Sequence, residues 1–234
     1  MKVLFIFAHP DDETFSSGGS ISKLTSSKHS VSLICATKGE AGEVGNPPLT
    51  DKKNLGKFRE NELKNAAKIL GITKIHFLGL IDGTLHKINT QKLVAAIFPI
   101  IKREQPDVVV TFDSTGASNH PDHIAISQAS TAAFDKYLTL TKKYVRLYHT
   151  AIPKSSLAKL KKAGLSYNAF GKIKGVEDKS ITTRINIKKE FLTKSKALKQ
   201  HKTQHKDWER FFKRNLVVDL NHEYFTLIKE NNLI

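Results

Sequence analysis

The sequence predicts an α/β fold: a Rossmann-like, doubly wound, mostly parallel sheet with helices on both faces. Short, continuous apolar runs rich in Val, Ile and Phe, such as residues 3–8 and 108–113, are typical of parallel strands buried on both sides. Longer segments suited to helices separate these runs, so strands and helices alternate through the first 140 residues. Right-handed crossovers then give a strand order of 3-2-1-4-5 as the simplest arrangement.

The expected elements follow in chain order, each bounded by Pro, Gly, Asp or Ser, which interrupt regular structure. Strands are expected near residues 2–8, 31–37, 74–79, 107–113, 144–152 and 180–187. Helices are expected near residues 17–28, 55–71, 90–104, 121–138, 155–163, 189–201 and 206–214. The long segment 40–55, which contains two Gly and two Pro residues, is expected to form a loop that acts as a lid over a site.

One short motif occurs twice, each time beyond a predicted strand. Residues 9–12 (His-Pro-Asp-Asp) follow the first strand, and residues 120–123 (His-Pro-Asp-His) follow the fourth. One copy alone would be ordinary turn chemistry, because Pro fixes φ and Asp or His can cap a helix. Ligands of doubly wound sheets bind where the strand order reverses, so neighbouring first and fourth strands would bring both copies together. The pair predicts a split metal site, in which three protein ligands leave a fourth position for water.

Five motifs in the first 130 residues together resemble the LmbE-like, PIG-L-type zinc de-N-acetylase family, in both order and spacing. They are Ala-His-Pro-Asp-Asp-Glu at 8–13, Thr-Lys-Gly-Glu-Ala-Gly at 37–42, Arg-Glu-Asn-Glu at 59–62, Leu-Gly-Leu-Ile-Asp-Gly at 78–83 and His-Pro-Asp-His at 120–123. The resemblance continues weakly at 196–204 and 223–225, whereas residues between about 140 and 190 match nothing particular. It implies a metal-dependent carbon–nitrogen hydrolase that removes an acetyl group from an N-acetylglucosamine-type amino sugar or its conjugate.

The resemblance implies that His9, Asp12 and His123 hold Zn²⁺, with Fe²⁺ as an alternative ion, and that Asp11 is the general base. The chemistry of the residues agrees with this division. Of two neighbouring carboxylates that point in different directions, one can bind the metal while the other accepts a proton. The ion lowers the pKa of the bound water, so the base removes a proton from this water more easily.

His120 is implied as the hydrogen-bond donor that stabilises the oxyanion and as the acid that protonates the leaving amine. Asp122 is expected to orient His120 and to raise its pKa.

The resemblance also implies that Arg59 and Asp82 bind sugar hydroxyls, with Glu43 as a weaker candidate. Spacing alone equally allows a solvated salt-bridge partner at Arg59 and an ordinary turn at Asp82. Among the other histidines, His76 and His149 are expected to be structural, and residues 199–206 are expected to form a solvated helix face that borders the cleft.

The chain is basic, and its charge is unevenly distributed. Residues 1–139 hold 16 Lys and Arg against 14 Asp and Glu, whereas residues 140–234 hold 22 against 8. Such a field could solubilise the surface, recognise an anionic substrate or attract nucleic acid. The lysines are scattered and no nucleic-acid-binding motif accompanies them, so nucleic acid is not expected as a partner. A basic binding module for nucleic acid or an anionic partner is nevertheless the alternative to an enzyme.

Composition favours one domain over residues 1–234, with a catalytic core at 1–139 and a basic part at 140–234 that packs on it. The first apolar run is too short for a signal peptide, and no run approaches the 18 or so residues of a membrane span. The single Cys35 fits a reduced cytoplasm, which is the expected location. The sequence leaves open the exact acylated substrate and the oligomeric state, so a homo-oligomer is also compatible with it.

Overall fold

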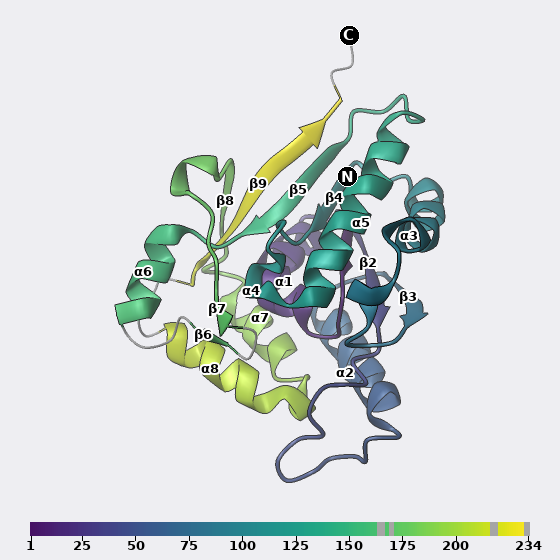
Figure 1. Cartoon of the computed structure of the whole chain (residues 1–234). Helices are drawn as coiled ribbons and strands as arrows, with labels where there is room; N and C mark the ends of the chain where they lie inside the picture. Colours follow the sequence, from purple (N-terminus) through teal and green to yellow (C-terminus); the bar gives the residue numbers. More distant parts are fainter. Residues whose placement is uncertain (163–166, 169–170, 216–219, 232–234) are drawn as a thin grey trace.

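The computed structural model describes residues 1–162, 167–168, 171–215 and 220–231 of the chain. Within these residues the main sheet has seven strands in the order β3-β2-β1-β4-β5-β9-β8 (Figure 1). The strands are β1 (Lys2–Phe7), β2 (Ser30–Thr37), β3 (Lys74–Leu80), β4 (Val108–Thr111), β5 (Arg146–Ala151), β8 (Thr183–Asn186) and β9 (His222–Glu230). The first five are parallel to one another, which confirms the predicted fold class and the order 3-2-1-4-5.

Helices cover both faces of this sheet, as predicted. They are α1 (Asp12–Ser26), α2 (Leu55–Leu70), α3 (Thr90–Glu104), α4 (Gly116–Asn119), α5 (Pro121–Leu138), α6 (Lys154–Lys162), α7 (Phe191–Leu198) and α8 (His205–Asn215). Helices α3 and α5 pack together on one face, and α1, α2 and α7 pack together on the other (Figure 1). Short 3₁₀ turns η1 (Leu85–Lys87), η2 (Asp178–Ser180) and η3 (Lys202–Gln204), and a hairpin of β6 (Tyr167–Asn168) and β7 (Gly171–Lys172), complete the described elements.

The core forms because the central strands are apolar on both faces. In β1 every residue after Lys2 is buried, and β4 is buried throughout. Val3 of β1 pairs with Val31 of β2 and with Val108 of β4, which fixes the register of the three central strands. Each Phe or Leu side chain buried in this way contributes about 1.5–3 kcal/mol. The rigid centre holds the carboxyl ends of β1 and β4 side by side.

Helix α1 begins at Asp12 rather than near residue 17. Its first turn consists of polar residues that are nevertheless buried, namely Asp12, Glu13 and Thr14. Helical periodicity of apolar residues therefore cannot reveal this turn, since the turn is buried through hydrogen bonds and not through apolar contacts. The position matters, because the first turn of α1 carries half of the repeated motif.

The basic part of the chain continues the same sheet. Strand β9, which the sequence did not predict, runs antiparallel to β5, and β8 runs antiparallel to β9. The strand expected near 180–187 is confirmed as β8, and helices α6, α7 and α8 lie in the segments expected at 155–163, 189–201 and 206–214. Residue 163, the end of the expected helix 155–163, lies outside the described residues.

A buried ion pair joins the basic part to α1. Lys194 Nζ of α7 lies 2.6 Å from Glu223 Oε1 of β9, and both side chains are almost fully buried. The Glu223 carboxylate also accepts hydrogen bonds from the backbone N–H groups of Gly19 and Ser20, while Lys194 donates to the carbonyl of Phe15. The pair thus fastens α7 and β9 to the middle of α1.

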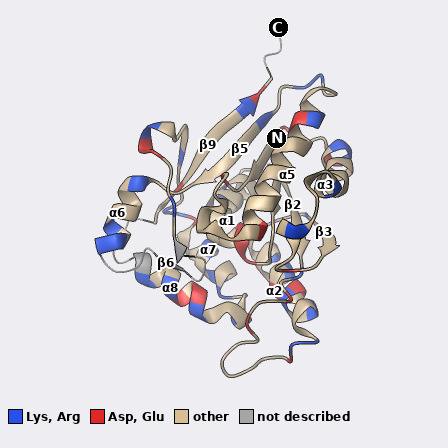
Figure 2. Ribbon diagram, viewed as in Figure 1, with Lys and Arg blue, Asp and Glu red and all other residues tan. Residues whose placement is uncertain are grey.

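Apart from Arg59 and Lys194, the Lys and Arg residues whose burial the structure describes are exposed or partly exposed. Figure 2 shows Lys and Arg spread over several elements, among them α3, α6 and α8, rather than gathered on one helix. In the part of the chain that the structure describes, no helix combines the length and apolar character needed to span a membrane.

Candidate metal centre and catalytic site

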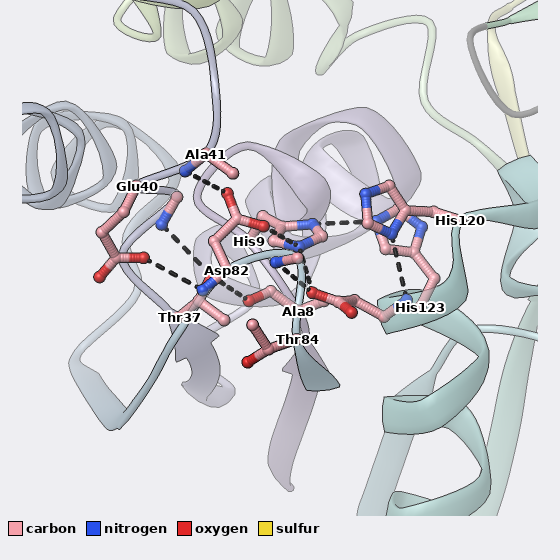
Figure 3. A network of polar contacts seen from close by, with 12 residues as sticks. Ala8, His9, Thr37, Glu40, Ala41, Asp82, Thr84, His120 and His123 are labelled. Carbon is pink, nitrogen blue, oxygen red and sulfur yellow. Dashed lines mark hydrogen bonds and ion pairs between the residues drawn. The ribbon is translucent and has the colours of Figure 1, made fainter. Parts of the chain in front are cut away.

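The two copies of the motif meet at the carboxyl ends of β1 and β4. His9 lies in the turn between β1 and α1, and His123 lies in the first turn of α5. Figure 3 shows His9 between Asp82 on one side and His120 and His123 on the other. His9 Nδ1 lies 3.1 Å from His123 Nε2. Parallel pairing of β1 with β4 therefore assembles the site from distant segments, as the sequence predicts.

Asp12 completes a compact set of three ligand-type side chains. Its Oδ2 lies 3.6 Å from His9 Nδ1, and its Oδ1 lies 3.2 Å from His123 Nε2. Zinc bonds of about 2.0–2.1 Å at tetrahedral angles place neighbouring ligand atoms about 3.3 Å apart. The three side chains are 7–8% exposed, so they are shielded from competing water. Their spacing fits a small divalent ion.

Hydrogen bonds on the outer sides of the two imidazoles direct their lone pairs inward. His123 Nδ1 donates to the carbonyl of Gly116 at 3.0 Å, and His9 Nε2 lies 2.9 Å from Asp82 Oδ1. With these outer nitrogens protonated, His9 Nδ1 and His123 Nε2 present lone pairs to each other and to the Asp12 carboxylate. Such an electron-rich pocket requires a positive charge, which supports the fit to a metal ion.

Titration behaviour agrees with this requirement. Burial lowers the pKa of His9, but hydrogen bonds to Asp122 and Asp82 and the charge of Asp12 raise it to about 10. Burial raises the pKa of Asp12, but His123 and His9 hold it well below its usual range. The pocket therefore attracts a proton where an ion is expected to bind.

A glycine allows the outer bond of His123. Gly116 has φ +65°, and a Cβ at this position would lie 2.7 Å from His123 Cβ. Any larger residue would clash with His123 and strain the backbone. Gly116 therefore lets its own carbonyl approach the imidazole.

Besides the triad completed by Asp12, two overlapping groups of three His or acidic side chains in the described chain have ligand atoms within 4.8 Å of one another. They are His9, His120 and His123, and His9, Asp82 and Asp122. The structure thus contains a possible metal-binding His/Asp site centred on His9. It places all the predicted ligands and the predicted catalytic residues of the second motif around this centre.

His120 is oriented by the start of α5. Its Nδ1 accepts a hydrogen bond from the backbone N–H of Asp122 at 3.1 Å, so its proton lies on Nε2. Burial and the charges of His9 and His123 lower the pKa of His120 to about 4, although Asp12 and Asp122 act in the opposite direction. Asp122 thus acts on the pKa of His120 in the expected direction, but burial and the two other imidazoles outweigh it, so the overall shift is downward. A neutral imidazole with Nε2–H is a hydrogen-bond donor at physiological pH.

Asp122 contacts His9 and His86. Its carboxylate accepts from the backbone N–H of Gly83 at 2.7 Å and lies 3.2 Å from His86 Nδ1 and 3.4 Å from His9 Nε2. The side chain that was expected to orient His120 thus supports the outer side of His9. His86, which follows the Asp-Gly turn, is a site residue that the sequence analysis missed, since a lone His in a loop carries no distinctive pattern.

Asp11 has a strained backbone. Its φ is 109° and its ψ is −28°, a left-handed conformation that non-glycine residues rarely adopt. Burial raises the pKa of its carboxyl to about 7, while Arg59 acts in the opposite direction. A carboxylate whose pKa lies near neutrality suits a general base, and strain at such a residue is typical of functional sites.

Arg59 holds Asp11 in place. Its Nη2 donates to Asp11 Oδ2 at 3.0 Å and to the carbonyl of Pro10 at 2.7 Å, and its Nη1 donates to the carbonyl of Gly39 at 2.9 Å. Arg59 is only 3% exposed and both terminal nitrogens bind protein oxygens, which favours a positioning role; its contact with sugar hydroxyls stays a prediction. Gly39, at φ +72°, makes room, since a Cβ there would lie 2.3 Å from Arg59 Nη1.

The other two predicted substrate contacts lie in different surroundings. Asp82 lies behind His9, and its Oδ2 accepts from the backbone N–H of Ala41 at 3.0 Å (Figure 3). Glu43 lies on the exposed loop between β2 and α2, where its Oε2 pairs with Lys206 Nζ at 2.9 Å. Asp82 thus supports the His/Asp cluster through His9, whereas Glu43 lies on the surface.

Residues 199–206, expected to form a solvated helix face, are only partly solvated: Lys199, Lys202 and Lys206 are exposed, whereas three other residues are buried. His201, Thr203 and Gln204 are almost completely covered, because η3 lies between α1, α2 and the loop after β2. Thr203 donates through its N–H and its hydroxyl to Glu62 of α2. Lysines lie between and beside these residues in the sequence, and for this reason the sequence predicts that the whole segment lies on the surface.

The fold and the site define a class of protein: a doubly wound α/β protein with a possible metal-binding His/Asp site at the carboxyl edge of its central strands. A model of the family PIG-L, GlcNAc-PI de-N-acetylase, matches residues 4–134. This chain belongs to the PIG-L family, which confirms the family predicted from the paired motifs.

Individual relatives support this assignment. A 1D-myo-inositol 2-acetamido-2-deoxy-alpha-D-glucopyranoside deacetylase of Actinosynnema mirum is 30% identical over 236 residues, which cover 89% of this chain and 82% of the relative. The structure of N,N'-diacetylchitobiose deacetylase from Pyrococcus horikoshii has a TM-score of 0.69 at 20% identity and covers 97% of this chain and 83% of its own. The 4-carboxy-2-hydroxymuconate hydratase of Pseudomonas putida shares the fold, with a TM-score of 0.70 at 17% identity over 99% of this chain and 97% of its own.

Proposed function

We propose that this protein is a zinc-dependent hydrolase that removes the acetyl group from an N-acetylglucosamine-type amino sugar or its conjugate. Membership of a de-N-acetylase family supports the reaction class. The observation that carries the proposal is the arrangement of His9, Asp12 and His123, whose ligand atoms lie 3.1–3.6 Å apart beside Asp11. The shared fold of a hydratase shows that the fold alone would not decide the reaction.

The donor set favours zinc, with Fe²⁺ as the alternative. Two imidazole nitrogens and one carboxylate match the preferences of either ion, and three protein ligands leave a position for substrate or water. When bound, the ion would act as a Lewis acid that polarises the acetamide carbonyl and makes water more acidic. Asp82 and Asp122 would hold His9 in the tautomer that binds.

The chain's own residues supply the proton transfers. Asp11, with its raised pKa, takes a proton from the attacking water as the new carbon–oxygen bond forms. His120 donates from Nε2 to the carbonyl oxygen, which becomes negatively charged in the tetrahedral intermediate. As the carbon–nitrogen bond breaks, protonated Asp11 delivers the proton to the leaving amine. We assign this step to Asp11, and not to His120 as first predicted, because the lowered pKa of His120 leaves that imidazole neutral. Acetate and a free amino sugar result, and Asp11 returns to its ionised form.

Arg59 contributes by positioning rather than by contact with the sugar. Its guanidinium bridges the Asp11 carboxylate and the carbonyls of Pro10 and Gly39, so the base and the turn that carries it move as one unit. Glu43, with its exposed carboxylate on the loop after β2, remains a candidate for contact with the substrate.

Acetate release tests the proposal. Protein loaded with one equivalent of Zn²⁺ or Fe²⁺ should release acetate from N-acetylglucosamine or from one of its α-glycosides or phosphorylated forms, and Asp11→Asn should not. Faster turnover of phosphorylated sugars that declines with salt would identify an anionic substrate for the basic part. Bound metal without release from any sugar would refute the proposed reaction and favour another amide or a binding role.

A further inference from the structure

His201 connects the basic part of the chain to the catalytic turn. It lies between α7 and η3, is 0% exposed, and is far in sequence from the paired motifs. Its Nε2 lies 3.3 Å from Glu13 Oε1 in the first turn of α1. Glu13 is itself fully buried and also accepts a hydrogen bond from the Thr14 hydroxyl. An imidazole and a carboxylate therefore meet in the first turn of α1, next to Asp12.

Glu13 also contacts Asp11, so it links His201 to the proposed base. Its second oxygen, Oε2, accepts a hydrogen bond from the backbone N–H of Asp11 at 3.1 Å. Asp11 has a φ of 109°, and such a conformation persists only where the surrounding structure holds it. Glu13 restrains the backbone of Asp11, whereas Arg59 restrains its carboxylate. The base is thus held from two sides.

His201 is placed for this one contact. Its Nδ1 is buried and has no hydrogen-bond partner among the described residues. A buried imidazole that only fills space would ordinarily have both nitrogens satisfied or would be replaced by an apolar side chain. Burial lowers the pKa of His201, but the hydrogen bond and charge of Glu13 raise it overall. The contact with Glu13 is therefore favourable and charge-assisted.

The segment around His201 is firmly anchored. Thr203 donates to Glu62 through its N–H at 2.8 Å and through its hydroxyl at 2.7 Å. The N–H of Gln204 donates to the carbonyl of His201 at 3.0 Å. These bonds attach η3 to α2 without involving Glu13 or Asp11. These contacts hold the backbone near His201 in place on α2, so the position of the imidazole relative to Glu13 is fixed.

We propose that His201 is a positioning residue for the general base: it fixes Glu13, which holds the Asp11 backbone in its left-handed conformation and aims the Asp11 carboxylate at the reacting water. The inference rests on the proposed function for the role of Asp11 as base. In this proposal the basic part of the chain, residues 140–234, contributes to catalysis through one residue, His201.

Kinetics of two His201 variants test the proposal. His201→Leu should lower kcat about 10- to 100-fold, because small displacements of a catalytic group have effects of this size. KM and zinc content should not change, because His201 contacts Glu13 and none of the proposed metal ligands. His201→Gln should recover most of kcat, since its carboxamide N–H can donate to Glu13. Loss of zinc from His201→Leu, or no recovery in His201→Gln, would overturn the proposal.

Thr203→Val serves as the matched control. It removes the hydroxyl bond to Glu62 but keeps the N–H bond that attaches η3 to α2, so it should lower thermal stability as His201→Leu does and still keep kcat. An equal loss of kcat in Thr203→Val would mean that general packing of η3, and not His201, supports the site.

A crystal structure of His201→Leu with metal bound gives a readout that does not depend on turnover. The Asp11 backbone should leave its left-handed conformation while His9, Asp12 and His123 stay in place. An unchanged Asp11 would overturn the proposal. If the wild type binds zinc but releases no acetate from any sugar, the proposed function fails, whereas this structure still decides whether His201 positions Asp11.

Discussion

His9 Nδ1 lies 3.1 Å from His123 Nε2, although 114 positions separate the two residues in the chain. Each imidazole directs its other nitrogen to an outer acceptor, Asp82 for His9 and the carbonyl of Gly116 for His123. The two facing nitrogens and the Asp12 carboxylate form a pocket that an ion would stabilise. The predictions below follow from this pocket and from the contacts that support it.

Loss of one facing imidazole should abolish metal binding. His123→Ala should weaken zinc affinity by more than about 100-fold, because even outer-shell partners of metal ligands contribute 10- to 100-fold. The measurement is zinc content after dialysis together with a competition titration. His29→Ala, which removes an imidazole that contacts the amino terminus of the chain, should retain one equivalent of zinc. Equal affinity in both variants would contradict the assignment of His123.

Replacement of Arg59 by lysine should impair turnover without loss of metal. A lysine cannot reach Asp11 and the carbonyls of Pro10 and Gly39 together, because it lacks the planar fork of donors. Arg59→Lys should lower kcat about 10- to 100-fold through misplacement of Asp11. The surface substitution Arg103→Lys provides the control for the same chemical change. A changed KM with unchanged kcat in Arg59→Lys would point instead to the substrate contact first predicted for it.

The buried Lys194–Glu223 pair should dominate the electrostatic contribution to stability. Lys194→Met leaves Glu223 as an uncompensated buried charge, which should cost about 3–5 kcal/mol of the free energy of unfolding. Lys154→Met, which breaks an ion pair with Glu177 on the exposed surface, should cost less than about 1 kcal/mol. Chemical denaturation measures both. Similar costs for the two variants would argue against a special role of the buried pair.

Stability should decline in mild acid because of His149. This residue of β5 is buried beside Thr131, and burial lowers its pKa to about 4 from an ordinary value of 6.5, with Asp113 opposing and Lys229 adding to the shift. The unfolded chain therefore binds a proton at higher pH than the native chain, so stability falls as the pH drops from 6.5 toward 4.

Substitution of His149 tests this pH dependence. In His149→Gln the loss of stability between pH 7 and pH 5 should be about 2 kcal/mol smaller than in the wild type, since one pKa unit corresponds to about 1.4 kcal/mol. Urea denaturation at the two pH values gives the difference. The same decline in both proteins would show that other groups are responsible.

Apolar patterns made the central sheet predictable. The runs that became β1 and β4 are buried on both faces, so their composition alone identifies them as parallel strands. The paired motifs then follow at the ends of two adjacent strands, and the topology brings them together. For this reason the meeting of the two motifs could be predicted before any contact was known.

Buried polar contacts were not predictable in the same way. Strand β9 carries Glu223 at a buried position, which interrupts the apolar alternation that would mark a strand. His201 lies among lysines but is buried through its contact with Glu13. In the sequence, Arg59 looks like a residue of an exposed helix face. The structure shows that it is buried and donates to two backbone carbonyls and to the Asp11 carboxylate. Such contacts depend on tertiary partners and leave no periodic trace in the sequence.

The central claim is that two adjacent carboxylates have different tasks, and the matched pair Asp11→Asn and Asp12→Asn tests it most directly. The measurement is zinc affinity and acetate release for both variants under the same conditions. Asp11→Asn should bind zinc like the wild type and lose nearly all turnover, whereas Asp12→Asn should lose zinc and turnover together. Equal loss of zinc in the two variants, or an active Asp11→Asn, would contradict the assignment of Asp11 as base and Asp12 as ligand.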